Sequence, residues 1–168
     1  MALFDRIALT LALGFYIGRI PWAPGTFGSV LGLGWFAVLV ATGSVWVFVS
    51  GMIFGIIVSV WACGRAERIL GVTDPGCVVL DEIVAIPIAG FGWVSLESVR
   101  LGRWPGPIEM MEGDRWILWV VLFGLFRLFD IWKPWPIREL QKLHGGWGVT
   151  ADDLLAAWYV NLILVWWI

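Results

Sequence analysis

The stretch Phe126-Arg-Leu-Phe-Asp-Ile-Trp-Lys-Pro-Trp-Pro-Ile-Arg138 decides how this chain of 168 residues is organised. It lies within a longer segment, residues 125–153, that gathers charged side chains in a sequence where only 14% of residues are charged. The only histidine, His144, lies in the same segment. Because a charge costs free energy next to hydrocarbon, an apolar chain should concentrate its charges where they have a function. The segment therefore predicts a functional site.

The composition around this segment is typical of a membrane protein. Apolar residues make up 60% of the chain, there are 14 tryptophans, and the mean hydropathy is +0.87. Soluble domains average about 45–50% apolar residues. We therefore expect one membrane domain spanning residues 1–168, with a very apolar soluble helical bundle as the alternative. A net charge of −2 without long basic runs argues against nucleic acid as a partner.

The apolar segments predict an all-α membrane bundle of about five to six helices, with a polar site at their cytoplasmic ends. A spanning helix needs about 20 apolar residues, with a range of 17–25, so only the second segment is comfortably long. We expect a short helix near the N-terminus (7–17) and a short amphipathic one after Pro136 (137–144). The main apolar segments are 27–42, 45–63, 78–94, 116–132 and 154–168.

Threading these segments alternately through a bilayer predicts which end of the bundle faces the cytoplasm. Residues 21–29, 64–80 and 127–153 then lie on one side, and residues 43–44 and 95–115 on the other. Lysine and arginine favour the cytoplasmic side, which makes the first side cytoplasmic. That side holds Arg19, Arg65, Arg68, Arg127, Lys133, Arg138 and Lys142, and the other holds Arg100, Arg103 and Arg115.

The first candidate site element is the turn Pro21-Trp-Ala-Pro-Gly-Thr-Phe-Gly-Ser29. Glycines at a helix start leave backbone N–H groups free to bind an anion, so Gly25, Thr26 and Ser29 are candidate phosphate-binding residues. The structural alternative is a proline-glycine turn in which Thr26 or Ser29 caps the helix that follows.

The second element is the adjacent pair Asp81 and Glu82 at the edge of an apolar segment. Adjacent residues lie about 100° apart on a helix, so both acids can approach one metal ion. An acid placed within a membrane segment is a functional candidate by default. The structural alternative is an ion pair with Arg65 or Arg68.

The third element is Arg127, Asp130 and Lys133, whose spacing of three places them along one helical face. Pro134 disfavours helical geometry at the residue before it, so the helix should end near Trp132. Lys133 would then lie in an extended segment, free to reach a phosphate. The alternative is an i,i+3 ladder in which Arg127 and Asp130 satisfy each other.

The fourth element is Thr150-Ala-Asp-Asp153. It fits a capping box that opens the last helix, with Thr150 as N-cap and Asp153 three residues later, which leaves Asp152 less easily explained. His144 should lie at the end of the short helix that precedes it, where a capping role is expected.

Together these elements can bring five carboxylates to one face beside Arg127 and Lys133. An all-oxygen set of ligands suits Mg²⁺ or Mn²⁺, which use one or two protein carboxylates with phosphate and water. The chain has no Cys-x5-Arg motif, no second histidine and no zinc-binding spacing at Cys63 and Cys77. The residues alone therefore predict a divalent-metal site for an anionic, phosphorylated substrate in the membrane. The candidate metal ligands are Asp81, Glu82, Asp130, Asp152 and Asp153.

Several motifs in the same order resemble the phosphatidylglycerophosphatase A family across roughly residues 21–157. The 126–138 run is the most specific of them, and the family's usual glycine is replaced by alanine at positions 85 and 157. The remaining motifs are Pro24-Gly-Thr with Gly28-Ser29, Gly71-Val-x-Asp74-x-Gly76 with Asp81-Glu82, and Gly145-Gly-x-Gly148 with Asp152-Asp153.

The resemblance implies an all-helical, Mg²⁺-dependent enzyme of the bacterial cytoplasmic membrane that hydrolyses phosphatidylglycerophosphate to phosphatidylglycerol and phosphate. We expect Asp130, Arg127, Lys133 and Asp81 to be catalytic, with Arg127 and Lys133 also binding the phosphate. One alternative is a small transporter or ion-conducting protein that uses the buried acids. Another is a phosphatase acting on a different lipid phosphate monoester. The sequence makes no prediction of oligomeric state.

Overall fold

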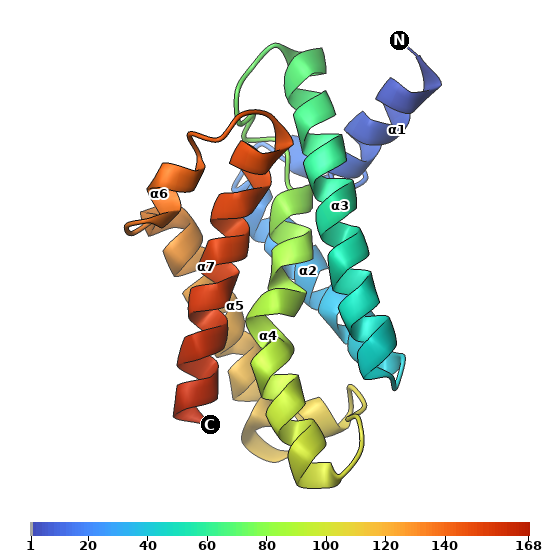
Figure 1. The fold of residues 1–168 in the computed structure, drawn as a ribbon, viewed down its shortest axis with the longest axis vertical. Coiled ribbons are helices and arrows are strands. Elements are labelled where there is room, and N and C mark those ends of the chain that lie inside the picture. Colours follow the sequence, from blue (N-terminus) through green and yellow to red (C-terminus); the bar gives the residue numbers. More distant parts are fainter. Residues whose placement is uncertain (1) are drawn as a thin grey trace.

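Long apolar helices run up and down between two ends of the molecule in a computed structural model that describes residues 2–168 (Figure 1). The five long helices are α2 (Pro24–Ala41), α3 (Val45–Leu70), α4 (Leu80–Leu101), α5 (Trp116–Trp132) and α7 (Gly146–Trp167). Two shorter α-helices are α1 (Leu3–Ala12) and α6 (Ile137–Leu140). Three 3-10 turns are η1 (Ile17–Arg19), η2 (Glu109–Met111) and η3 (Gly113–Arg115).

The predicted all-α membrane bundle is confirmed, with seven α-helices among residues 2–168 instead of five to six. Four of them, α2, α3, α4 and α7, are long and apolar enough to cross a membrane. They are longer than the apolar segments predicted because each continues through polar or glycine-containing turns. The 17-residue α5 has the predicted bounds and lies beside them (Figure 1).

Helix α7 begins at Gly146, four residues before Thr150, the predicted N-cap, and eight residues before the predicted apolar segment 154–168. Its first residue packs so closely on α3 that a Cβ at Gly146 would lie 1.7 Å from the Val60 carbonyl oxygen. Glycine is a weak helix former and commonly follows a helix end. Here the glycines begin a helix instead, because only they allow its first turn to lie against α3.

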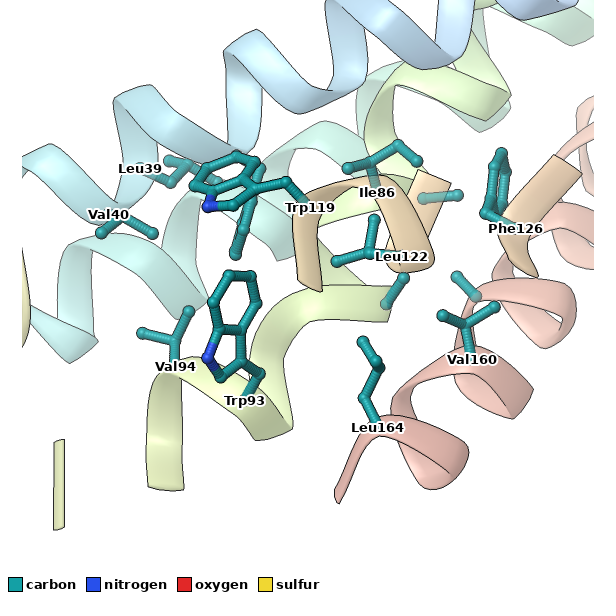
Figure 2. Packing of buried hydrophobic residues seen from close by; sticks show 14 of the residues in the cluster. Leu39, Val40, Ile86, Trp93, Val94, Trp119, Leu122, Phe126, Val160 and Leu164 are labelled. Carbon is teal, nitrogen blue, oxygen red and sulfur yellow. The ribbon is translucent and has the colours of Figure 1, made fainter. Parts of the chain in front are cut away.

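Helix α4 occupies the middle of the bundle and packs against α2, α3, α5 and α7 (Figure 1). Figure 2 shows the core beside it, where Trp93 from α4 meets Trp119 from α5 with ring centroids 5.8 Å apart. Phe36 from α2 lies 5.0 Å from the Trp119 ring. This central position buries the first turn of α4, including its two acids.

The outward faces of the bundle are apolar, as expected of an integral membrane protein. Phe54 and Ile57 in the middle of α3 are 66% and 62% exposed. Tryptophans, which favour membrane–water interfaces, are exposed at both ends of the bundle. They include Trp22, Trp135 and Trp147 at one end and Trp46, Trp116 and Trp166 at the other.

The connection between α4 and α5 lies at the end away from the candidate site (Figure 1). The buried Glu97 of α4 is bonded there to Arg100 at 3.0 Å and to Arg115 at 3.2 Å. Arg103 pairs with Glu109 in the loop itself, and its hydrogen bonds lower the pKa of the Glu109 carboxyl. These contacts anchor a loop that is built from two 3-10 turns.

Candidate functional site

The first turn of α4 buries two adjacent acids, Asp81 and Glu82, which are 6% and 8% exposed. The Asp81 carboxylate accepts the backbone N–H of Glu82 at 3.0 Å. Glu82 packs on the start of α2, where a Cβ at Gly25 would lie 1.9 Å from Oε1 and a Cβ at Gly28 2.4 Å from Oε2. Glycine at both positions is therefore what lets the carboxylate approach the α2 backbone.

The glycine-containing turn is the first turn of α2, with Ala23 as N-cap and Pro24 at the first helical position. The interpretation of Thr26 or Ser29 as the N-cap is therefore wrong, because proline already fits the first helical position. The Ser29 hydroxyl lies within the helix and donates to the Gly25 carbonyl at 2.9 Å. Among residues 2–168, no hydrogen bond joins the Thr26 side chain to the acids.

Arg127, on the last turns of α5, links this turn to the acids. Its Nη1 donates to Glu82 Oε1 at 2.8 Å and to Asp130 Oδ2 at 2.5 Å. The same nitrogen lies 3.4 Å from the Ser29 hydroxyl. The i,i+3 ladder that we considered as the alternative thus exists, but it extends to α4 and so holds two helices together.

The alternative pairing of the α4 acids with Arg65 or Arg68 is wrong. Arg65 pairs with Asp5 of α1 at 2.6 Å, and this bond lowers the pKa of Asp5. Arg68 donates to the Gly64 carbonyl at 3.1 Å within α3. Both arginines are therefore engaged elsewhere, and Glu82 takes its cationic partner from α5.

Lys133 ends α5 in a left-handed conformation with φ of +46°, so the prediction that it lies in an extended segment is wrong. Its N–H still closes the helix on the Phe129 carbonyl at 2.8 Å before Pro134 stops further turns. The ammonium group pairs with Asp152 and lies 3.7 Å from Asp130 Oδ1. Lys133 therefore joins α5 to α7.

The environment of Lys133 keeps it charged. Burial by itself lowers the pKa of the ammonium group, but the carboxylates around it outweigh that effect and raise the pKa above its ordinary value. Those carboxylates are Asp152, Asp153 and Asp130. The cation is thus held inside a cluster of acids.

Asp152 and Asp153 lie in the second turn of α7 and are 2% and 3% exposed. The predicted capping box is wrong, because the helix begins four residues before Thr150. The Thr150 hydroxyl is buried and lies 3.0 Å from the Ser59 hydroxyl of α3. Both aspartates are consequently inside the bundle and not at a helix entrance.

His144 lies apart from this group of charges. Helix α6 ends at Leu140 and is capped by Gln141, so the predicted capping role of His144 is wrong. The histidine is exposed and lines a pocket of about 800 Å³ with Arg68 and Lys142. None of the five candidate carboxylates lines this pocket, and the site chemistry lies elsewhere.

The contact of Gly25 and Gly28 with Glu82 is the part of the site that the sequence interpretation missed. The sequence predicts only a backbone role in binding phosphate for Gly25. The signal was present in the spacing of Gly25, Gly28 and Gly32, which places three small residues along one face of α2. Small residues at this spacing are typical of close helix packing in membranes.

The carboxylate oxygens of this site suit a divalent cation that also binds phosphate and water. The buried oxygens Glu82 Oε2, Asp152 Oδ1 and Asp153 Oδ1 lack hydrogen-bond partners, and carboxylate oxygens can only accept. Within residues 2–168, no group of three or more Asp, Glu, His or Cys side chains is gathered tightly enough to hold a metal alone. These residues therefore fit Mg²⁺, which commonly takes one or two carboxylates plus phosphate and water.

Comparison with known proteins identifies the family. The model of the family described as phosphatidylglycerophosphatase A matches residues 10–168. A phosphatidylglycerophosphatase A of Haemophilus influenzae is 34% identical over 155 residues, covering 92% of this chain and 84% of the relative. One of Escherichia coli is 32% identical over 149 residues, covering 87% of this chain and 74% of the relative.

A relative with another name matches equally well. A provisionally named phosphatidylinositol-3-phosphatase of Bacteroides thetaiotaomicron is 32% identical over 163 residues, covering 94% of this chain and 91% of the relative. No solved structure matches the chain significantly. The family match covers every charged residue of the candidate site. The chain therefore belongs to the phosphatidylglycerophosphatase A family.

Proposed function

We propose that this chain is a Mg²⁺-dependent phosphatase that hydrolyses phosphatidylglycerophosphate to phosphatidylglycerol and inorganic phosphate. The observation that carries the proposal is the alternation of acids and cations from three helices at one end of a membrane bundle. There, Arg127 bridges Glu82 and Asp130, and Lys133 pairs with Asp152. The names of two relatives point to the same substrate.

The two cations suit phosphoryl transfer, in which positioning and electrostatic stabilisation do most of the catalysis. Arg127 and Lys133 would balance the negative charge on the phosphate oxygens, helped by the backbone at Gly25, Thr26 and Ser29. Their present partners are carboxylates, so an entering phosphate would share or replace those contacts. This arrangement keeps both cations in place before substrate binds.

The carboxylates supply two further functions. Asp81, Glu82, Asp130, Asp152 and Asp153 are the oxygens from which metal ligands would be drawn, and bound Mg²⁺ would neutralise charge on the phosphate. One carboxylate, for which we propose Asp130 or Asp81, would accept a proton from the attacking water. Water attacks phosphorus and the bond from phosphorus to the glycerol oxygen breaks. The leaving oxygen takes a proton from solvent water, and the carboxyl group releases to solvent the proton that it accepted.

We place this site at the cytoplasmic face of the bacterial inner membrane. The charged residues meet where α4 and α7 begin and α5 ends, which is one end of the bundle (Figure 1). Positive residues are more frequent in the connections at this end. A transporter would instead place its acids near the bilayer midplane. The position of the charges therefore favours an enzyme that receives a lipid head group at the interface.

Chelation tests the metal dependence. Phosphate release from phosphatidylglycerophosphate in detergent should stop when EDTA exceeds the divalent cations, and should return when excess Mg²⁺ is added. Undiminished release in excess EDTA would overturn the metal mechanism.

Replacement of Asp130 tests the site itself. We expect Asp130→Asn to lower kcat by about 100-fold or more, because a general base or metal ligand would be lost. Thermal unfolding in detergent would show that the variant is folded. Asp114→Asn, an exposed aspartate at the other end of the bundle, is the matched control and should retain activity. Near-normal turnover by Asp130→Asn would show that Asp130 serves only as a structural ion-pair partner of Arg127.

A second candidate substrate is phosphatidylinositol 3-phosphate, favoured by the name of the Bacteroides relative. Both lipids carry a phosphate monoester on a diacylglycerol-based lipid, so the charged site suits either. Comparison of kcat/KM for the two lipids in the same detergent would decide between them.

A further inference from the structure

An apolar groove of about 400 Å³ lies beside the candidate site, between α1, α2 and α4. Its lining is almost entirely apolar and includes Leu31, Gly34 and Val38 of α2. On the opposite wall are Leu80 and Ile83, which flank Asp81 and Glu82 in α4. A volume of this size is within the range of about 300–1,000 Å³ that is usual for small-molecule pockets.

The groove begins next to the charged site and runs away from it along α2. Gly25 and Gly28, in the first turns of that helix, contact the Glu82 carboxylate. Leu31, Gly34 and Val38 follow at intervals of about one turn. At 1.5 Å per residue, Leu31 and Val38 are about 10 Å apart along the helix axis. The groove therefore extends from Leu80 and Ile83, beside the acids of α4, toward the far end of α2.

Gly34 leaves the space that makes this surface concave. A Cβ at Gly34 would meet no atom within 4 Å, so no packing contact requires glycine there. Glycine in the middle of a helix destabilises it by about 1 kcal/mol relative to alanine. The residue therefore weakens the helix without allowing a close approach between helices. Gly34 instead provides an open volume in the wall of the groove.

We propose that this groove binds an acyl chain of the lipid whose phosphate occupies the charged site, and that the absence of a side chain at Gly34 admits that chain. The inference rests on the proposed lipid phosphatase function. Bulk lipid can cover any outward apolar surface. Leu80 and Ile83, which line this groove, lie on either side of Asp81 and Glu82 in the first turn of α4. A lipid whose phosphate lies at those acids therefore has its own chain within reach of the groove.

The test is the chain-length preference of variants that fill the groove. The probes are dioleoyl and dibutanoyl phosphatidylglycerophosphate in the same detergent, and the readout is the ratio of kcat/KM for the long-chain lipid to that for the short-chain lipid. Gly34→Phe should lower this ratio by about tenfold, as expected when about two methylenes lose apolar contact. Gly34→Leu should have an intermediate effect. Gly124→Phe, at an exposed glycine of α5 with equally open surroundings, is the matched control and should keep the wild-type ratio.

The outcomes separate this inference from the proposed function. A Gly34→Phe ratio equal to that of the wild type, or equal falls in Gly34→Phe and Gly124→Phe, would overturn the groove assignment. If the wild type hydrolyses neither lipid, the proposed function has failed. Cross-linking then tests whether the groove binds an acyl chain. The probe is dioleoyl-length phosphatidylglycerophosphate with a photoreactive diazirine in mid-chain. Labelling of residues 31–38 that Gly34→Phe suppresses supports the groove, and its absence overturns it.

Discussion

At the scale of single residues, one guanidinium group holds the candidate site together. Arg127 Nη1 contacts Glu82 and Asp130 at the same time, and all three side chains are largely buried. Removal of one member of a buried ion pair commonly costs about 3–5 kcal/mol, since its partner keeps an uncompensated charge. Arg127 therefore has a structural role as well as its proposed catalytic one. Besides Asp130→Asn, catalysis can be tested at positions that shift the carboxylates without removing a charge.

Gly25 offers such a test. A Cβ at Gly25 would lie 1.9 Å from Glu82 Oε1, which is the mobile end of a side chain, so Gly25→Ala should displace the carboxylate and leave the helix intact. Displacement of a site group by about 1 Å can cost about 100-fold in rate, and we expect a loss of kcat/KM near that size. Gly124→Ala should show neither this loss nor a lower melting temperature. Full activity in Gly25→Ala would show that the position of Glu82 is unimportant.

The raised pKa of Lys133 leads to a prediction about the pH dependence of activity. Because its pKa in the folded protein is raised above the unfolded value, its ion pairs contribute their full stability below about pH 10.4 and lose it only as pH rises through the folded pKa. Lys133 should therefore cause no loss of activity between about pH 8 and 10. Rate profiles of the wild type and Lys133→Arg should have parallel alkaline limbs over this range. A wild-type decline that the arginine variant lacks would contradict the assignment.

At the scale of elements, the crossing of α3 and α7 positions Asp152 and Asp153. Gly64 and Gly146 meet there backbone to backbone, where a Cβ at Gly64 would lie 2.6 Å from the Gly146 nitrogen. Ser59 and Thr150 continue the contact with a hydrogen bond one turn farther along. The close approach fixes how deep the second turn of α7 lies in the bundle.

Substitution at this crossing should destabilise the whole protein. The neighbours of a Cβ at Gly146 are backbone atoms, which cannot rotate away, so Gly146→Ala should lower the free energy of unfolding by about 1–3 kcal/mol through overpacking. The measurement is thermal or denaturant unfolding in detergent, with Gly124→Ala as the helical control. A Gly146→Ala variant as stable as that control would contradict the close crossing.

At the scale of the whole molecule, the two ends of the bundle differ in what they hold. One end carries the charged site with the α3–α4 and α6–α7 connections, and the other carries the loop around Glu109 (Figure 1). Positive residues predict that the first end is cytoplasmic. A substrate phosphate would then reach the site from the cytoplasmic leaflet.

Cysteine labelling in cells checks this orientation. In a Cys63→Ala, Cys77→Ser background, Asp114→Cys should react with a membrane-impermeant maleimide in spheroplasts. Thr73→Cys, in the exposed α3–α4 connection, should react only after permeabilisation. The reverse pattern would place the site on the outer face and overturn the proposed location.

The sequence by itself determined the fold class and the residues that carry charge. Hydrophobic composition and segment length predicted an all-helical membrane bundle because a bilayer requires backbone groups to be satisfied within each span. Pro134 predicted the end of α5 at Trp132, since proline removes a donor and blocks the preceding turn. The clustering of rare charges, from Asp81 to Asp153, identified the candidate site for the same energetic reason.

Only the tertiary structure decided which charges pair and where helices begin. Glu82 pairs with Arg127 and not with Arg65, and Lys133 pairs with Asp152. Helix α7 begins at Gly146. Each of these outcomes depends on contacts between helices that are distant in sequence. Glycine commonly follows a helix end, but close packing against Val60 places Gly146 at the start of one. Local patterns depend on the properties of single residues and their neighbours. Pairing and register depend on how closely backbones can approach, and here glycines 25, 28, 64 and 146 set that distance.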